Sequence, residues 1–314
     1  MDKAKLAELK TAATKIRLLA VKGVHAAKSG HPGGSLSIAD ILAYLYFNKM
    51  NVDPKNPQWE DRDRLVLSKG HTAPALYSVL ALKGYFPEEE ILKLRQVDSF
   101  LQGHPEMKHT PGVDMTTGSL GLGISAACGM ALSAKISGKS YRTYAIVGDG
   151  ESEEGQVWEA CMFAAHYKLD NFVAVFDWNG LQIDGAIVDV MNPTPFDKKL
   201  EAFGFNVISI DGNNFDEIDA AFTAAEQCKG KPTAIIAKTT KGKGVSYMEN
   251  QASWHGNAPS DEQYEQADAL EAEGDLQAAF DLFYSLSSYR DAASRAQSLA
   301  DRLGIKIKTI DDPF

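Results

Sequence analysis

The segment RTYAIVGDGESEEGQVWEACMFAAHYKLDNFVAVFDWN, residues 142–179, decides the fold. It opens with a β-branched run, Arg142 to Val147, and closes with a second one, Phe172 to Phe176. Each run is short and apolar enough to be a strand buried on both faces. Between them, Glu153 to Lys168 places apolar residues at helical spacing. The segment therefore predicts a strand, a helix and a parallel strand joined by a right-handed βαβ crossover.

The rest of the main domain repeats this pattern. Later strands are predicted at Asn206 to Ile210 and at Thr233 to Ala237, and Asp216 to Cys228 is the helix between them. Together these crossovers predict a mainly parallel sheet with helices on both faces, which is a three-layer α/β/α fold. From about Ser260 the sequence becomes rich in Ala, Leu and Glu. We therefore expect a main domain over residues 1–259.

The remaining residues, 260–314, are predicted to be a C-terminal helical appendage. Residues 261–302 resemble one helical hairpin of a tetratricopeptide-like repeat, with Gly274 and Asp275 at its first turn. One such repeat cannot bury its apolar face alone. It would therefore pack on the main domain or on a partner subunit, and the sequence leaves both options open.

Composition excludes several classes of function. The formal net charge is −10, whereas nucleic acids and anionic membranes both select a net basic face. The three cysteines form no CxxC pair, so neither a disulfide framework nor a zinc knuckle is supported. Residues 1–20 are amphipathic and lack a signal core, and no stretch approaches the roughly 20 apolar residues of a membrane span. We expect a cytoplasmic protein.

The first chemical signal is a Gly148-Asp149-Gly150 turn directly after one strand, with Asn179 directly after the next. Open α/β sheets bind their ligands at these carboxyl ends of strands. Glycines let the backbone approach a phosphate closely, and an Asp carboxylate with an Asn carbonyl provides hard oxygen ligands for Mg2+. Gly-Asp-Gly alone is more often an ordinary turn. The spacing to Asn179 favours a phosphate and metal site.

Four of the seven histidines stand in polar, glycine-rich segments: His31 in SGHPGG, His71 in SKGHT, His104 in QGHP and His255 in SWHG. A lone histidine is usually structural, but loops of this kind often carry function. Imidazoles can donate hydrogen bonds to anions or transfer protons near neutral pH. We expect at least two of the four to be functional, and the pattern does not say which two.

A glycine-rich segment, TTGSLGLGIS at residues 116–125, leads into an Ala-rich helix. Its G-x-x-G-x-G order without a preceding strand fails the context that a dinucleotide fingerprint requires. Either close approach of the backbone to a flat ligand or tight helix packing would explain its glycines. Lys238, Lys241 and Lys243 follow the last predicted strand and could attract a sugar phosphate, although charged turn residues are usually solvated.

Together these motifs resemble the transketolase family, over Thr11 to about Pro259, and the match is to its diphosphate-binding domain. The SGHPGG signature around His31 makes the resemblance specific, because deoxyxylulose-phosphate synthase shares the Gly-Asp-Gly motif but lacks this signature. The resemblance implies thiamine diphosphate and Mg2+, or Ca2+ or Mn2+ in its place, as cofactors. It also implies transfer of a two-carbon ketol unit between sugar phosphates, in the pentose phosphate pathway.

The resemblance also assigns roles to individual residues. Asp149, Asn179 and the backbone carbonyl of Leu181 match metal ligands, while His31, His104 and His255 match groups for proton transfer and contacts with substrate oxygens. Glu154 and Glu159 match acidic positions at a contact between two active sites. The full set of matched cofactor-binding positions is His71, Gly118, Leu120, Gly148, Asp149, Gly150, Glu154, Glu159, Asp177, Asn179, Leu181 and His255.

A full-length transketolase continues through a pyrimidine-binding domain, which carries the glutamate that activates the cofactor, and then a third domain. This sequence includes neither. We therefore expect the N-terminal subunit of a split transketolase, which needs a C-terminal subunit for activity and forms a heterotetramer with two copies of each chain. The alternatives are a non-catalytic or regulatory thiamine-diphosphate-binding subunit and another thiamine-dependent ketol or ketoacid enzyme. The four histidines favour catalysis, because a pure cofactor binder needs only metal and diphosphate contacts.

Overall fold

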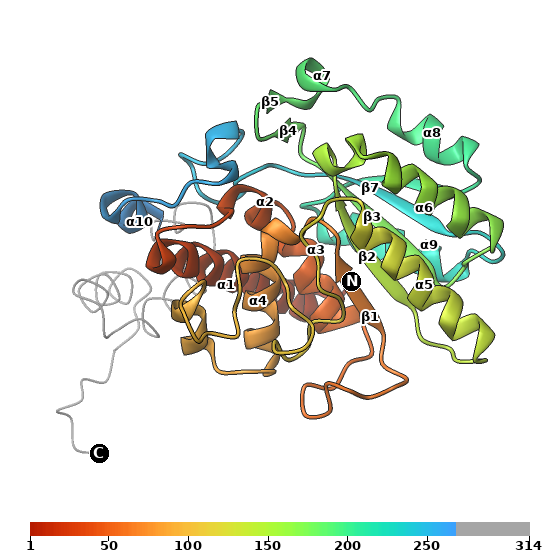
Figure 1. The fold of residues 1–314 in the computed structure, drawn as a ribbon, viewed down its shortest axis with the longest axis horizontal. Coiled ribbons are helices and arrows are strands. Elements are labelled where there is room, and N and C mark those ends of the chain that lie inside the picture. Colours follow the sequence, from red (N-terminus) through yellow and green to blue (C-terminus); the bar gives the residue numbers. More distant parts are fainter. Residues whose placement is uncertain (268–314) are drawn as a thin grey trace. The chain divides into compact units, whose positions relative to one another are not determined.

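The structure, a computed structural model, describes residues 1–267. Its main sheet consists of β1 (Arg64–Leu67), β2 (Thr143–Gly148), β3 (Phe172–Trp178), β6 (Asn206–Asp211) and β7 (Thr233–Lys238). Every neighbouring pair is parallel, and the order across the sheet is β1-β2-β3-β7-β6. Figure 1 labels the first four of these strands. The predicted parallel sheet is confirmed.

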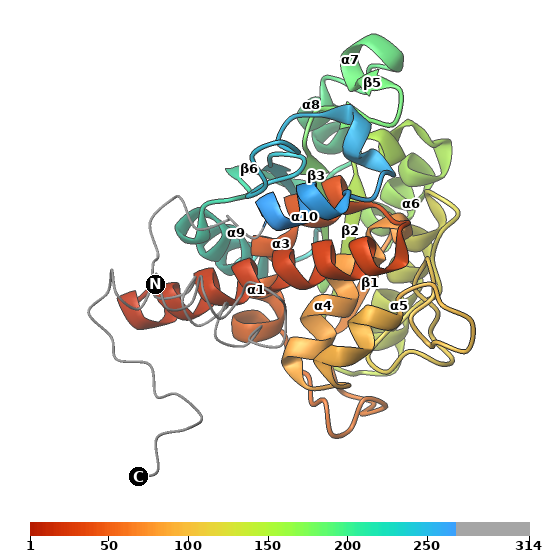
Figure 2. The ribbon, with the colours of Figure 1, turned by 90° about the vertical axis from the view of Figure 1, so that its left-hand side faces the viewer.

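Helices cover both faces of this sheet (Figures 1 and 2). One face carries α1 (Lys3–Ala27), α3 (Ala39–Tyr44), α4 (Ala73–Lys83) and α9 (Phe215–Gln227). The other face carries α5 (Leu122–Ile136), α6 (Gly155–His166) and α8 (Phe196–Ala202). The predicted three-layer α/β/α arrangement is therefore confirmed.

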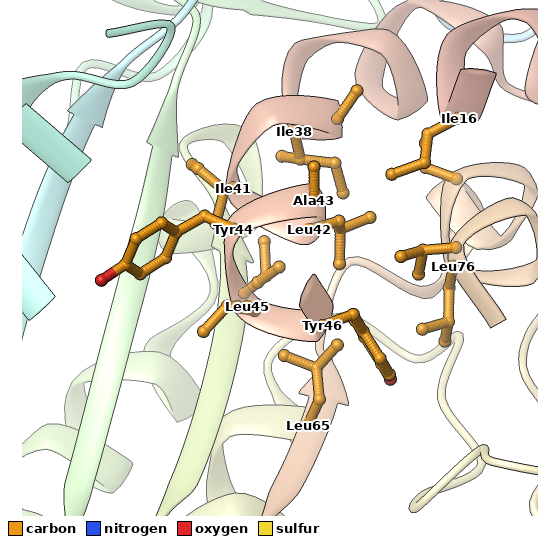
Figure 3. Close-up of a cluster of buried hydrophobic side chains, with 14 of the residues drawn as sticks. Ile16, Ile38, Ile41, Leu42, Ala43, Tyr44, Leu45, Tyr46, Leu65 and Leu76 are labelled. Atoms are coloured by element: carbon orange, nitrogen blue, oxygen red, sulfur yellow. The ribbon is translucent and has the colours of Figure 1, made fainter. Parts of the chain in front are cut away.

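Alternate residues of each strand pack into the two helical layers. In β3, Val173 and Val175 join the cluster under α1 and α4, whereas Phe172 and Phe176 join the cluster under α5 and α6. Figure 3 shows part of the first cluster, in which Leu42 of α3 lies among apolar side chains from α1, α4 and β1. Burying one such side chain stabilises the fold by about 1.5–3 kcal/mol. Because both faces are covered, the inner strands β2, β3 and β7 are buried over nearly their whole length, whereas the edge strand β6 is largely half-buried.

The predicted elements differ from the observed ones mainly at their ends. Strand β1, residues RLVL, was not among the predicted strands, because four residues between charged neighbours give little pattern. The helix predicted from Glu153 begins at Gly155, since Gly150–Glu153 forms a separate 3-10 turn after β2. It ends at His166, and Lys168 beyond it adopts a left-handed φ of 51°.

Several short elements surround the carboxyl edge of the sheet. They are α2 (Pro32–Ser37), 3-10 turns at Gly70–Thr72 and Ala252–His255, the small hairpin of β4 (Leu181–Gln182) and β5 (Gly185–Ala186), and α7 (Ile187–Val190). These pieces are too short to be read as periodic sequence patterns. They nevertheless carry five residues of the candidate site: Gly34, His71, Leu181, Gln182 and His255.

The predicted C-terminal hairpin falls largely outside the described residues, as do Gly274 and Asp275. Of its range only α10 (Asp261–Ala267) is described. This helix begins against α1, where Asp261 accepts a hydrogen bond from Lys28 and the ring of Tyr264 stacks on His25 with centroids 4.2 Å apart. The hairpin and the boundary at residue 260 stay predictions. Within residues 1–267, no helix has both the length and the hydropathy needed to cross a bilayer.

Candidate active site

A cavity of about 390 Å³ lies where the carboxyl ends of β2 and β3 meet the surrounding loops. Lys69, after β1, and Lys241, after β7, also face it, so four strands contribute to one site. Ten of the predicted residues line it: His71, Gly118, Leu120, Gly148, Asp149, Gly150, Glu154, Asn179, Leu181 and His255. The sequence therefore identified much of the wall of this cavity, although it missed Lys69 and named Lys241 only as one of three lysines.

Asp149 lies in the cavity wall and is held by backbone donors. Its carboxylate accepts hydrogen bonds from the amides of Gly150 at 2.9 Å and of Gly180 at 2.6 Å. The side chain is almost wholly buried. Burial, followed by the nearby charge of Asp177, raises the pKa of Asp149 above its usual range. A bound cation would compensate a carboxylate in this environment.

Three oxygen donors around the cavity suit a hard metal ion. They are the carboxylate of Asp149, the side-chain carbonyl of Asn179 and the backbone carbonyl of Leu181. Mg2+ prefers such ligands and keeps further positions for water or phosphate oxygens. No group of three or more His, Cys, Asp or Glu side chains forms a metal site among residues 1–267. The set around Asp149 has one carboxylate only, so its chemistry fits Mg2+ and does not fit a zinc centre.

Asp177 lies beneath the cavity and does not line it. Its carboxylate is fully buried and accepts hydrogen bonds from Lys69 at 2.6 Å, Ser37 at 2.8 Å and the amide nitrogen of Asn179 at 3.0 Å. Thr239 also donates to it. Because the Asn179 amide nitrogen is engaged in this way, the Asn179 carbonyl oxygen is turned away from Asp177. Asp177 therefore orients a proposed ligand, although its match to a cofactor motif implied direct binding.

Four imidazole rings gather beside the cavity. The centroid of His31 is 5.2 Å from that of His71, 5.4 Å from that of His255 and 6.3 Å from that of His104. His71 and His255 face the cavity, whereas His31 and His104 form the adjoining layer. The sequence predicted these four histidines as a group, and the structure brings all of them together.

The cluster is held in its neutral form. Burial, and then neighbouring positive groups, lowers the pKa of His31 and of His255 from 6.5 to about 4. The same causes lower the pKa of His71 well below its usual value, and that of His104 is lowered as well. At neutral pH these rings therefore act as neutral hydrogen-bond donors and acceptors, and their ordinary titration near neutrality is displaced toward acid.

The two explanations for the glycine-rich segment fare differently: tight packing holds for Gly123, whereas close approach of the backbone to a flat ligand stays a prediction for Gly118. Gly118 lines the cavity with a φ of +155°, and a Cβ there would lie 3.2 Å from the His104 ring. Gly123 serves packing, because a Cβ on it would lie 2.6 Å from the Cα of Ser68. The segment is fixed by buried Glu151, which accepts a hydrogen bond from the amide of Gly121 at 2.9 Å.

The two acidic residues predicted at a subunit contact differ in position. Glu154 precedes α6 as its N-cap residue, is exposed and lines the cavity. Glu159 is also exposed, but lies farther along α6 and does not line the cavity. Both carboxylates are therefore accessible to another chain, and only Glu154 is part of the cavity wall.

Six lining residues were not predicted: Gly34, Lys69, Glu151, Glu153, Gln182 and Ile183. A seventh, Lys241, was named only as one of three lysines that could attract a sugar phosphate. Lys241 is 2% exposed, whereas Lys238 is exposed and Lys243 is half-buried. The rule that ligands bind at the carboxyl ends of strands applies to all three lysines at or after the end of β7, so only the burial of Lys241 in the folded chain separates it from its neighbours. For Gln182 and Ile183, no sequence signal exists, because their position depends on the small hairpin of β4 and β5.

Comparisons with known proteins identify the family of this chain. The family model for the thiamine diphosphate binding domain of transketolase matches residues 9–280. The chain is 48% identical over 268 residues to the 6-deoxy-6-sulfo-D-fructose transketolase subunit of a Clostridium species. The aligned residues cover 85% of this chain and 98% of that relative. It is 43% identical over 260 residues to an apulose-4-phosphate transketolase subunit of Phocaeicola vulgatus, covering 83% of this chain and 92% of the relative.

Solved structures give the same result. The transketolase of Campylobacter jejuni matches with a TM-score of 0.80 and 33% identity, covering 95% of this chain and 48% of that one. The similarity therefore extends over nearly the whole of this chain and about half of a single-chain transketolase. By sequence, by fold and by the cavity at the carboxyl edge of its sheet, this chain belongs to the transketolase family, where it corresponds to the thiamine-diphosphate-binding domain.

Proposed function

We propose that the cavity binds thiamine diphosphate with a divalent metal ion, and that the chain takes part in moving a two-carbon ketol unit between sugar phosphates. One observation carries this proposal. Asp149, which can ligate a metal, Lys241, a buried cation, and His255, a neutral imidazole, all line the same cavity. A phosphorylated cofactor and a hydroxylated substrate need these three kinds of group together.

Each part of the cavity has a distinct task in this proposal. When bound, thiamine diphosphate supplies the electron sink for breaking and forming the carbon–carbon bond. Asp149, Asn179 and the Leu181 carbonyl hold the metal ion, and Lys241 faces the diphosphate. The histidines position substrate oxygens and transfer protons. Because these rings are neutral, they do not attract the diphosphate into the region where the substrate binds.

A partner subunit is the second part of the proposal. The two relatives of similar length are both named as subunits, and the Campylobacter jejuni transketolase is about twice as long. We infer that a C-terminal subunit supplies the pyrimidine-binding domain and its glutamate. Two copies of each chain would give the twofold symmetry usual for such assemblies. Exposed Glu154 and Glu159 would then lie at a contact between chains.

A regulatory thiamine-diphosphate-binding subunit is the competing function. Such a protein would need the metal ligands and Lys241, but it would have no use for His31 and His104, which lie outside the cavity wall. The presence of two further imidazoles in contact with the inner pair favours catalysis.

Reconstitution decides between these functions. The chain is mixed with its cognate C-terminal subunit, the mass of the complex is measured by sedimentation, and ketol transfer is assayed with xylulose 5-phosphate and ribose 5-phosphate. The names of the relatives add 6-deoxy-6-sulfo-D-fructose and apulose 4-phosphate as donors to be tested in parallel. Ketol transfer by the mixture, with none by either chain on its own, supports the proposal. Full activity of the isolated chain would contradict the need for a partner, and a stable inactive complex would favour regulation.

A further inference from the structure

Arg95 has an uncommon backbone conformation beside the histidine cluster. Its φ is +60°, in the left-handed region that residues with a side chain rarely adopt. Its amide donates to the carbonyl of Leu101 at 2.9 Å, which closes the short loop between them. Strain of this kind persists where the surroundings determine it, and it often occurs at functional sites. The direction of the Arg95 side chain indicates the structural role of this loop.

The guanidinium of Arg95 is directed toward His31. Its Nη1 donates to the hydroxyl of Ser29 at 2.8 Å, and its Nη2 lies 3.5 Å from Nδ1 of His31. Gly103 provides the space, because a Cβ there would lie 3.0 Å from Nε of Arg95. The side chain is thus anchored by one hydrogen bond, packed against a glycine, and placed with a second donor at one specific ring nitrogen.

The chemistry of Arg95 selects one form of the His31 ring. A guanidinium has donors only and stays protonated in proteins. The nitrogen that faces it, Nδ1, must therefore be the unprotonated acceptor, and in a neutral ring the proton is then on Nε2. The Nε2 edge faces Gly256, whose missing side chain leaves room: a Cβ there would lie 3.7 Å from Nε2.

The charges around His31 also favour its neutral form. Rings of His71, His104 and His255 surround it, and burial is the largest cause of its lowered pKa, followed by the charges of Arg95, His104 and Lys241. Arg95 also lowers the pKa of His104, after burial. No carboxylate contributes to the pKa of either ring. Burial and these neighbouring groups thus oppose protonation of His31.

We propose that Arg95 is a positioning residue that holds His31 as the neutral tautomer protonated on Nε2. His31 then presents an Nε2–H donor on its Gly256 side, which suits a substrate hydroxyl or carbonyl oxygen, rather than a lone pair or a positive charge. The part of this inference that concerns substrate rests on the proposed function. The tautomer itself does not, since it is a property of the isolated chain.

The test is a long-range 1H–15N correlation spectrum of the chain with 15N-labelled histidines, recorded without cofactor or partner from about pH 5 to about pH 8. His31→Gln assigns the His31 signals. We expect an unprotonated Nδ1 and a protonated Nε2 throughout this range. In Arg95→Met, which keeps the length of the stem and removes the donor and the charge, we expect mixed tautomers and a His31 titration that moves toward its ordinary value.

Two further variants separate the effects of charge and geometry. Arg95→Lys keeps the charge but loses the planar fork, so His31 should stay neutral while its tautomers mix. Ser29→Ala removes the anchor of the guanidinium and should mix the tautomers partially. An unchanged His31 spectrum in Arg95→Met overturns the proposal and leaves Arg95 a structural role. If that variant does not fold, an unchanged tautomer ratio in Arg95→Lys has the same consequence.

This outcome is independent of the proposed function. A failure to obtain ketol transfer after reconstitution would leave the His31 spectra valid, and a negative spectrum would leave the transferase assay valid. In the active complex, Arg95→Met should lower kcat/KM and shift the acid limb of the pH profile, whereas a purely structural residue would reduce activity equally at every pH.

Discussion

The ammonium nitrogen of Lys241 lies 3.1 Å from the backbone carbonyl oxygen of Leu181, the oxygen that we propose as a metal ligand. The same nitrogen lies 3.3 Å from Nδ1 of His255. Burial lowers the pKa of Lys241, and the carboxylate of Asp149 partly opposes this shift. Lys241 is therefore a fixed cation between the proposed metal site and the histidine cluster, and it is well placed for an anionic diphosphate.

Replacing Lys241 by Met should weaken thiamine diphosphate binding by about tenfold to a hundredfold, the usual effect of losing a hydrogen bond to a charged group. Titration calorimetry with saturating Mg2+ measures the affinity. Lys243→Met is the matched control, because Lys243 is half-buried and paired with Glu249 at 3.5 Å. The control should bind like the unmodified chain, and an equal loss in both variants would mean that only net charge matters.

Asp149→Ala should remove most of the metal dependence of cofactor binding, since it deletes the only carboxylate of the proposed ligand set. Titrations with and without Mg2+ should then give nearly the same weak affinity. Asp184→Ala changes the charge equally at an exposed position near the cavity and should keep the dependence. If the unmodified chain already binds equally well without Mg2+, the metal assignment to Asp149 and Asn179 is wrong.

His104→Ala should lower turnover of the reconstituted complex by about 10²- to 10⁴-fold, the usual effect of losing a general acid–base group. Cofactor affinity should change much less, because His104 does not line the cavity. The control is His109→Ala, whose exposed ring pairs with Glu106. A weakened cofactor with unchanged turnover would instead make His104 an anchor of the diphosphate.

The stability of the fold should depend on pH through His71. Its folded pKa is lowered well below 6.5, so the unfolded chain binds more protons once the pH falls below that value. The free energy of unfolding should therefore decrease as the pH falls from about 7 to about 5. In His71→Gln, which cannot be protonated, denaturant titrations should show a smaller decrease. His166→Gln, at an exposed ring, should behave like the unmodified chain, and identical slopes in all three would refute this prediction.

Much of the fold could be predicted because long, two-sided apolar runs such as β2 and β3 have few alternatives. The turn after β2 and the residue after β3 were found for the same reason, since a parallel sheet places both at one edge. Four histidines in glycine-rich segments were recognisable as a group. Their spatial order was not, because His31, His71, His104 and His255 come from four separate loops.

The features that could not be predicted from the sequence depend on long-range contacts. The lowered pKa values follow from burial that only the assembled loops create, and a histidine in a polar segment gives no sign of it. Arg95 lies in an ordinary charged stretch, and its left-handed φ has no signature in its own residue type. Lys69, bound to Asp177 across 108 positions of sequence, is likewise visible only after folding.

The position of β7 has a consequence for how the protein is made. This strand lies between β3 and β6 and is the last of the sheet in chain order, and Lys241 and His255 follow it. A nascent chain emerging from the ribosome thus exposes Asp149 and His71 long before the strand that completes the sheet is available. The cavity wall can therefore be complete only after residue 255 has been made, because Lys241 and His255 both line it.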